Sequence, residues 1–207
     1  MRGCRPLTTP EVAAAAETMT GSTGKRDRAM MLVGINTGFR ISELLALSVG
    51  DVVTPAGEIT RRVTVARKNT KGRHGSRTVL LNSQARAALL PWLDILAGRG
   101  YVHATDPLWP SFRTGRRLGR VQAWRVLVNA FRAAGLDGQL GTHCLRKTFA
   151  NNNYGELLQR VAMGEPIDAF RTVSKLLDHA AITSTDKYLS FRLAEYDGVV
   201  ERAGVAI

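Results

Sequence analysis

The side chains best suited to chemistry include an arginine that directly follows a break between two predicted helices. Arg40 comes two residues after Gly38, at the N-terminal end of the second helix. The helix dipole disfavours a cation at this position, but the free backbone N–H groups there can bind a phosphate together with the arginine. An exposed Arg40 paired with Glu43 is the simpler interpretation of this segment when it is taken alone.

A histidine and a second arginine lie together in a later helix. His143 and Arg146 are three residues apart, so they share one face of the helix that Thr142 is predicted to cap. A lone histidine is usually structural. A histidine and an arginine on one face, in a chain with only four histidines, favour a phosphate site.

Three further residues could take part in proton or covalent chemistry. Lys71 lies in a predicted turn, where it could donate a proton to a leaving oxygen, although phosphate contact is the more common role of a lysine. His179 ends one predicted helix, and Tyr188 lies in the next. Tyr188 alone would be interpreted as a core or interface aromatic.

Helices must position most of these side chains. Thr9-Pro10-Glu11 predicts a helix start with Thr9 as N-cap, and Ser83 is predicted to cap a helix that ends near Leu96. The other predicted helices cover about 10–19, 26–36, 40–47, 119–134, 142–154, 166–178 and 183–192, with a short one near 193–203.

A single hairpin is the only predicted β-structure. Residues 62–65 and 77–81 are rich in β-branched side chains, and the basic, glycine-containing stretch 68–76 forms its tip. The predicted fold class is therefore mainly α with a small antiparallel β-sheet (α+β).

The charge of the chain points to a polyanionic partner. Its 207 residues include 29 Lys and Arg against 17 Asp and Glu, a net charge of +12 with a pI near 10.6. The basic residues gather in two stretches without acids, 61–77 and 113–132. Nucleic acid is the favoured partner, and the candidate contacts are Arg67, Lys68, Arg73, Arg77, Arg116, Arg117 and Arg120.

The rest of the composition excludes several classes of protein. The N-terminal residues have no apolar signal region, and the longest apolar run, about 29–35, is too short to span a membrane. Cys4 and Cys144 do not form a closely spaced pair, so neither a disulfide framework nor a zinc site is predicted. An intracellular protein is expected.

The ordered combination of these residues resembles the tyrosine recombinase (phage integrase) family. The family pattern is Arg, Lys, His-x-x-Arg, His and then Tyr nine residues later, and it falls on Arg40, Lys71, His143, Arg146, His179 and Tyr188. The local motifs also match, with Thr-Gly-Phe-Arg-Ile-Ser-Glu-Leu-Leu-Ala-Leu around Arg40 and His-Cys-Leu-Arg-Lys-Thr-Phe-Ala around Arg146. The resemblance spans about residues 7–190 and implies the catalytic-domain fold of that family.

The sequence departs from the family pattern in three places. Asp178 stands where the family usually has glycine before the histidine, and Lys147 stands where a second histidine is frequent. The segment between Arg146 and His179 is longer than usual. We expect a single catalytic domain over 1–207, with a C-terminal tail at 191–207 and without the N-terminal core-binding domain that such enzymes commonly carry.

The resemblance implies cleavage and rejoining of DNA without metal, ATP or another cofactor. Tyr188 would attack the scissile phosphate to form a 3′-phosphotyrosine, and a 5′-hydroxyl could reverse the step on another strand. Arg40 and Arg146 would bind the phosphate oxygens, and His143 and His179 would donate hydrogen bonds, with His143 also able to take the Tyr188 proton. Lys71, or Lys68 in its place, would protonate the leaving oxygen. Glu43 is expected to buttress Arg40, and Asp51 to support the fold.

The implied partners follow from the same resemblance. They are double-stranded DNA with a specific recombination site, three further copies of the chain in a homotetramer on DNA, and accessory DNA-bending proteins. The tail after Tyr188 would dock on a neighbouring subunit. The implied location is the cytoplasm of a bacterial or phage-infected cell, in association with the nucleoid and without a membrane.

Other functions remain open at this stage. A type IB topoisomerase-like enzyme would use the same chemistry to relax supercoils. Relaxation of supercoiled DNA that lacks a specific site would distinguish this activity from recombination. A non-catalytic DNA-binding regulator would bind normally and be unaffected by Tyr188→Phe. A basic RNA-binding domain is disfavoured because no aromatic stacking motif occurs. Tyr101, Tyr154 and Tyr196 are rival nucleophiles.

Overall fold

The computed structural model describes residues 4–65, 76–178, 185 and 189, and the fold below refers to these. The described chain is mainly helical with one two-stranded sheet, so the predicted fold class is confirmed. Its elements in order are α1 (Thr9–Thr18), a 3-10 turn (Gly21–Thr23), α2 (Gly24–Thr37), α3 (Ile41–Ala46), α4 (Val49–Val52), β1 (Arg62–Val65), β2 (Arg77–Leu80), α5 (Ser83–Gly98), α6 (Arg120–Ala133), α7 (Thr142–Ala162) and α8 (Ala169–Leu176).

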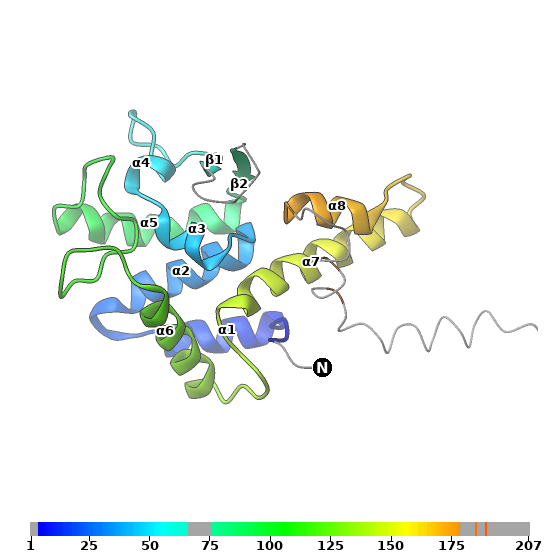
Figure 1. The fold of residues 1–207 in the computed structure, drawn as a ribbon, viewed down its shortest axis with the longest axis horizontal. Coiled ribbons are helices and arrows are strands. Elements are labelled where there is room, and N and C mark those ends of the chain that lie inside the picture. Colours follow the sequence, from blue (N-terminus) through cyan, green and yellow to red (C-terminus); the bar gives the residue numbers. More distant parts are fainter. Residues whose placement is uncertain (1–3, 66–75, 179–184, 186–188, 190–207) are drawn as a thin grey trace, which may run out of the picture. The chain divides into compact units, whose positions relative to one another are not determined.

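The chain divides into two compact units, Met1–Phe149 and Ala150–Ile207. The first unit contains α1 to α6 and the first turns of α7. Inside it, α2 packs along α5 and α1 packs against α6, as Figure 1 shows. Most residues of α2 are buried, which shows that this helix lies at the centre of the first unit. It therefore fixes the position of the α2–α3 junction.

Two stacked tryptophans form part of the core beside α3. The rings of Trp92 and Trp109 lie 6.5 Å apart and nearly parallel, and both are fully buried. The indole N–H of Trp109 donates to the carbonyl of Leu44 at 2.8 Å, and that of Trp92 donates to Leu108 at 2.8 Å. These bonds satisfy the only polar atom of each ring and tie α3 and α5 to the loop at 99–119.

The predicted hairpin is confirmed. β1 pairs antiparallel with β2 in a register that places Val63 opposite Val79, and both of these side chains are buried. The outward residues of the two strands are polar or exposed, which is the alternation expected for a sheet with one covered face. The tip of the hairpin falls outside the described residues.

Thr142, predicted to cap α7, is instead the first residue of that helix. Two further predicted helix caps are wrong by one residue. The N-cap of α1 is Thr8, whose hydroxyl accepts from the N–H of Glu11, and Pro10 follows within the first turn. The N-cap of α5 is Asn82, whose side chain accepts from the N–H of Ala85. In each case two neighbouring residues are good caps, and the sequence predicts the second where the structure uses the first.

The unusually long segment after Arg146 begins as a continuation of α7 into the second unit. α7 extends to Ala162, beyond the predicted end near residue 154. Gly164 then turns the chain with φ +91°, and the carboxylate of Glu165 accepts from Arg160 at 2.9 Å. Asp168 caps α8. Of the predicted helix at 183–192, the structure describes Thr185 and Leu189, which are both helical and buried, and the short helix predicted near 193–203 lies outside the described residues.

Asp178 adopts the left-handed backbone conformation. Its φ is +53°, the positive value that favours the glycine usual at this position. Aspartate tolerates this region better than most residues. The turn before His179 therefore forms although the glycine is replaced.

Among the described residues, no helix is long and apolar enough to cross a membrane.

Candidate active site

The α2–α3 junction places Arg40 at the surface. Gly38 ends α2 with φ +63°, and a Cβ added there would lie 2.4 Å from Cδ1 of Phe149. Only glycine fits this position, because it lacks a Cβ and adopts positive φ without strain. Phe39 is then buried, and Arg40 becomes the N-cap residue of α3.

Glu43 holds Arg40 in place, as the sequence predicts. The backbone N–H of Arg40 donates to one carboxylate oxygen of Glu43 at 2.8 Å, and its guanidinium donates to the other at 2.9 Å. The Arg40 side chain is still 43% exposed. A positioned guanidinium that reaches solvent can bind an incoming phosphate without first being ordered.

Arg77 of β2 completes this cluster. Its guanidinium donates to Glu43 at 2.6 Å and lies 5.7 Å over the ring of Phe39. Two guanidinium groups thus share one carboxylate, which leaves the cluster of Arg40, Glu43 and Arg77 with a net positive charge. The Arg77 side chain is only 10% exposed. This burial fits a residue that supports Arg40 through Glu43 better than the DNA contact predicted from its charge.

Glu43 stays ionised in this setting. Burial alone raises the pKa of Glu43, but the hydrogen bond from the Arg40 backbone and the charge and hydrogen bond of Arg77 outweigh it. The net pKa lies below the ordinary value of a glutamate. The carboxylate therefore keeps its charge at neutral pH and holds both arginines.

Asp51 supports the fold nearby, as the sequence predicts. Its carboxylate accepts from the backbone N–H of Ser48 at 2.7 Å and from the Ser48 hydroxyl at 2.6 Å. These bonds cap α4, the short helix that follows α3.

The first turns of α7 bring the second arginine to the same junction. Arg146 is buried, and its guanidinium donates a hydrogen bond to the carbonyl of Gly38. That carbonyl lies two residues before Arg40. The start of α7 therefore contacts the α2–α3 junction within the first unit, two residues before the other candidate phosphate-binding arginine.

His143 lies in the same helical turn as Arg146 with a lowered pKa. Partial burial contributes most, followed by the positive charges of Arg146, Arg120 and Lys147. The imidazole is therefore neutral at pH 7, the form that can accept a proton. The imidazole takes up a proton less readily in the folded chain than in the unfolded chain. The free energy of unfolding is therefore expected to fall as the pH drops below about 6.5.

Removing a neighbouring charge is expected to raise the pKa of His143. In Arg120→Gln we expect an NMR titration of the His143 ring to move toward the ordinary value of about 6.5. Arg116→Gln is the matched control, because Arg116 is an exposed arginine that does not contribute to the shift. Equal titration midpoints in the wild type and Arg120→Gln would contradict this assignment.

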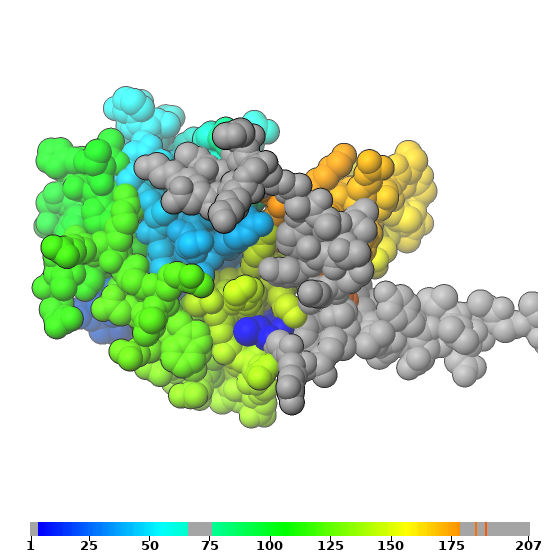
Figure 2. Space-filling model, viewed as in Figure 1, coloured from blue at the N-terminus to red at the C-terminus, as the bar shows by residue number. Residues whose placement is uncertain are grey.

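The basic residues of the loop and α6 differ in their surroundings. Arg117 donates to the carbonyls of Ala46 and Leu47 at 2.5 and 2.6 Å, so it binds the C-terminal end of α3. Arg116 is exposed in the loop, and Arg120 is the exposed first residue of α6. Figure 2 shows the face on which the loop at 99–119 (green) and the segment around α3 (blue to cyan) adjoin.

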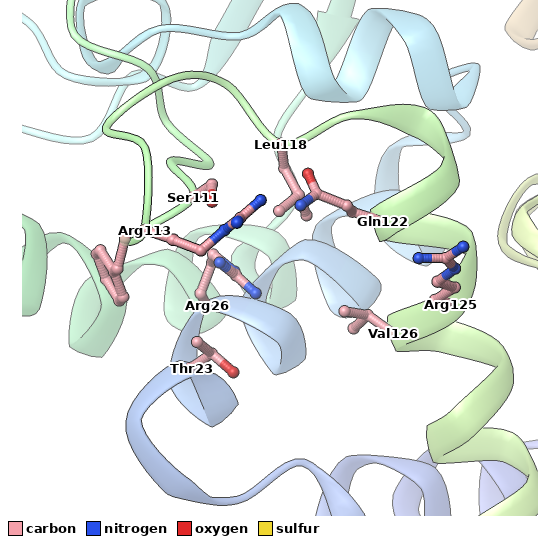
Figure 3. Close-up of a pocket in the computed structure, with 9 residues that line it drawn as sticks. Thr23, Arg26, Ser111, Arg113, Leu118, Gln122, Arg125 and Val126 are labelled. Atoms are coloured by element: carbon pink, nitrogen blue, oxygen red, sulfur yellow. The ribbon is translucent and has the colours of Figure 1, made fainter.

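Two hollows border these residues. One of about 420 Å³ is lined by Ile41, Arg120, Val121, Trp124 and Thr142, beside the start of α7. Another of about 340 Å³ lies between the start of α2, the loop and α6. Figure 3 shows the guanidinium groups of Arg26 and Arg113 on one side of it and Gln122 on the other. The Arg26 guanidinium is paired with Asp27 at 2.7 Å, so it has a structural partner.

Several predicted site residues lie outside the described residues. They are Lys71, His179 and Tyr188 among the proposed catalytic groups, and Arg67, Lys68 and Arg73 among the proposed DNA contacts. Their positions remain predictions. Among the described residues, no group of three or more His, Cys, Asp or Glu side chains gathers in a way that could hold a metal ion.

The sequence alone did not indicate the role of Arg77 or the link between Arg146 and Gly38. Arg77 and Glu43 are 34 positions apart, and Arg146 and Gly38 are 108 apart. The one available signal for Arg77 was that it opens a predicted strand after the basic turn. That signal does not separate a buried arginine from an exposed one.

Comparisons with known proteins identify the family of the chain. The family model described as "Phage integrase family" matches residues 6–193. Tyrosine recombinase XerC of Herpetosiphon aurantiacus is 34% identical over 91% of this chain and 56% of its own length. Type 1 fimbriae regulatory protein FimE of Escherichia coli is 32% identical over 96% of this chain and 91% of its own length.

Solved structures share the fold. The crystal structure of XerA recombinase superposes with a TM-score of 0.71 at 21% identity, covering 98% of this chain and 66% of that one. XerH site-specific recombinase in a post-cleavage complex gives a TM-score of 0.66 at 19% identity, over 95% and 52%. The chain spans just over half the length of the Xer relatives in sequence. The resemblance drawn from the motifs is confirmed, and the chain belongs to the phage integrase family.

Proposed function

We propose that this chain is a site-specific DNA recombinase that cleaves and rejoins strands through a 3′-phosphotyrosyl bond to Tyr188. The observation that carries the proposal is the contact of Arg146 with the Gly38 carbonyl, two residues before Arg40 at the α2–α3 junction. Membership of the phage integrase family and the likeness to recombinases named XerC and XerA support it.

Each proposed step assigns one bond or proton to a named group. The oxygen of Tyr188 attacks phosphorus, the bond to the 5′-oxygen breaks, and a 3′-phosphotyrosine forms. Neutral His143 takes the tyrosine proton, and Lys71 gives a proton to the leaving 5′-oxygen. Arg40 and Arg146, with His179, neutralise the nonbridging oxygens, on which negative charge gathers in the transition state.

The proposed partner is double-stranded DNA. The structure of XerH has been solved bound to a palindromic difH substrate, and by analogy this chain would bind a specific recombination site. The exposed residues Arg116 and Arg120 are the proposed phosphate contacts among the described part, with Arg117 tied partly to α3. Four chains on two DNA sites, joined through the tail at 191–207 and aided by DNA-bending proteins, remain our prediction. The molar mass of the complex with DNA tests the tetramer.

Trapping the covalent complex tests the function. A DNA substrate nicked near the cleavage position loses its short 5′-hydroxyl fragment, so religation is prevented and the phosphotyrosine accumulates. We expect a protein–DNA adduct that withstands detergent, with the DNA on the peptide that contains Tyr188. Tyr188→Phe should form no adduct, and Tyr196→Phe is the matched control that should form it normally.

Two results would contradict the proposal. DNA attached to the Tyr196 peptide would show that the nucleophile is misassigned. Normal DNA binding without any adduct, over a range of candidate attachment sites, would instead support a non-catalytic regulator. Relaxation of supercoiled DNA that lacks a specific site would support topoisomerase-like activity.

A further inference from the structure

The two cysteines of the chain, at positions 4 and 144, are brought together next to the proposed catalytic helix. The segment that carries Cys4 runs along the turn before α7. The backbone N–H of Arg5 donates to the carbonyl of Gln139 at 3.3 Å, and the N–H of Leu7 donates to the Thr148 hydroxyl at 2.8 Å. These contacts fix the main chain on the C-terminal side of Cys4.

Both sulfur atoms converge on Gly141. The N–H of Gly141 donates to the sulfur of Cys144 at 3.1 Å, and a Cβ added to Gly141 would lie 3.5 Å from the sulfur of Cys4. Both thiols therefore lie against the same glycine. Cys4 is partly exposed and Cys144 is buried, so an oxidant in solution reaches Cys4 first.

The pair is chemically unequal. The hydrogen bond from Cys144 lowers the pKa of Cys4 to about 6, with help from the charge of Lys147 and against the effect of burial. The same contact and burial raise the pKa of Cys144. Cys4 is therefore the more readily ionised thiol of the pair, and the thiolate is the nucleophilic form.

We propose that Cys4 and Cys144 form a reversible disulfide when the chain meets a peroxide, and that this bond slows the reaction served by His143 and Arg146. The second half rests on the proposed function. Cys144 lies between these two residues in the first turns of α7. Forming a bond of about 2.05 Å between the two sulfur atoms pulls on that turn.

The reaction balances with hydrogen peroxide as the oxidant. The Cys4 thiolate attacks one peroxide oxygen, the O–O bond breaks, and a sulfenic acid and one hydroxide result, which leaves as water. The Cys144 sulfur then attacks the sulfenic sulfur, the S–O bond breaks, and its proton leaves with the hydroxyl as a second water. Two thiols and one peroxide thus give one disulfide and two waters, and a dithiol reverses the change.

The test uses the reduced full chain treated with hydrogen peroxide and digested with trypsin without reductant. We expect a linked peptide pair containing Cys4 and Cys144 that dithiothreitol separates. Closing a loop of about 140 residues should raise Tm by about 5–10 °C. In Cys144→Ser, the sulfenic acid of Cys4 should persist and be captured by dimedone, because the second thiol is absent. Dimedone-labelled Cys4 in the wild type without linked peptides would overturn the disulfide.

The effect on activity is measured on the same samples. The oxidised chain should cleave DNA at least about fivefold more slowly than the reduced chain, since small displacements of catalytic groups are costly, and Cys4→Ser should be insensitive to peroxide. A linked chain that cleaves within about twofold of the reduced rate would overturn the regulatory half. If the reduced chain does not cleave at all, the proposed function and the regulatory half both fail, while the linked peptides still decide the disulfide.

Discussion

Replacing Arg146 by alanine is expected to slow DNA cleavage by a factor of about a hundred to a thousand. Loss of one preorganised donor to developing negative charge typically raises the barrier by about 2.7–4 kcal/mol. Arg146 is buried and already donates to the carbonyl of Gly38, so its guanidinium is held in place before DNA binds. The measurement is the single-turnover cleavage rate at saturating DNA, which separates the chemical step from binding.

Arg40→Ala should show a loss of the same order, because both guanidinium groups are proposed to bind the same phosphate. Arg146→Lys should recover only a small part of the rate, since an ammonium group keeps the charge but cannot bind two oxygens in a fork. Arg28→Ala is the matched control, because Arg28 is an exposed arginine of α2 to which we assign no role. Its rate should equal that of the wild type.

Thermal unfolding of each variant shows whether a slower cleavage rate reflects loss of the folded state instead of loss of a catalytic group. The Arg146 variants lose a buried hydrogen bond, so a moderate fall in Tm is expected together with the fall in the cleavage rate. A variant of Arg40 or Arg146 that is folded, bound to DNA and still cleaving within about fivefold of the wild type would refute the proposed phosphate cradle.

Gly38→Ala is expected to destabilise the chain by about 3 kcal/mol and to lower Tm by about 6–12 °C. The added methyl group would lie 2.4 Å from a carbon of the Phe149 ring, and φ at this position is +63°. The junction must therefore shift. The carbonyl of Gly38 accepts a hydrogen bond from Arg146, and Arg40 follows two residues later. Cleavage should therefore also slow in the fraction of the variant that remains folded.

Gly135→Ala separates the two causes of this loss. Gly135 also follows a helix with a positive φ, +70°, but no atom lies within 4 Å of an added Cβ. It should cost only the backbone strain, about 1 kcal/mol, and leave the cleavage rate unchanged. Equal loss of Tm in the two variants would mean that the contact with Phe149 does not constrain the junction.

Local features were predictable from sequence because they depend on residues close together in the chain. The break at Gly38, the contact of Glu43 with Arg40 and the hairpin strands all follow from spacings of a few residues, and all are present. The missed caps at Thr8 and Asn82 show the limit of such rules. Adjacent polar residues cap equally well, so packing decides between them.

The end of α7 marks a second limit. The sequence predicts an end near residue 154, whereas the helix continues to Ala162, through three consecutive asparagines at 151–153 that have low helix propensity. Propensity differences amount to a few tenths of a kcal/mol per residue, which the rest of a long helix can offset.

The sequence by itself determined the mainly helical class, the family and the residue types of the candidate site, since these depend on local periodicity and motif order. Only the tertiary structure decided that Arg146 reaches Gly38, that Arg77 supports Arg40 through Glu43, and that Cys4 meets Cys144. Such contacts join positions more than thirty residues apart. They depend on how helices pack around a common core, and no short-range pattern in the chain records that packing.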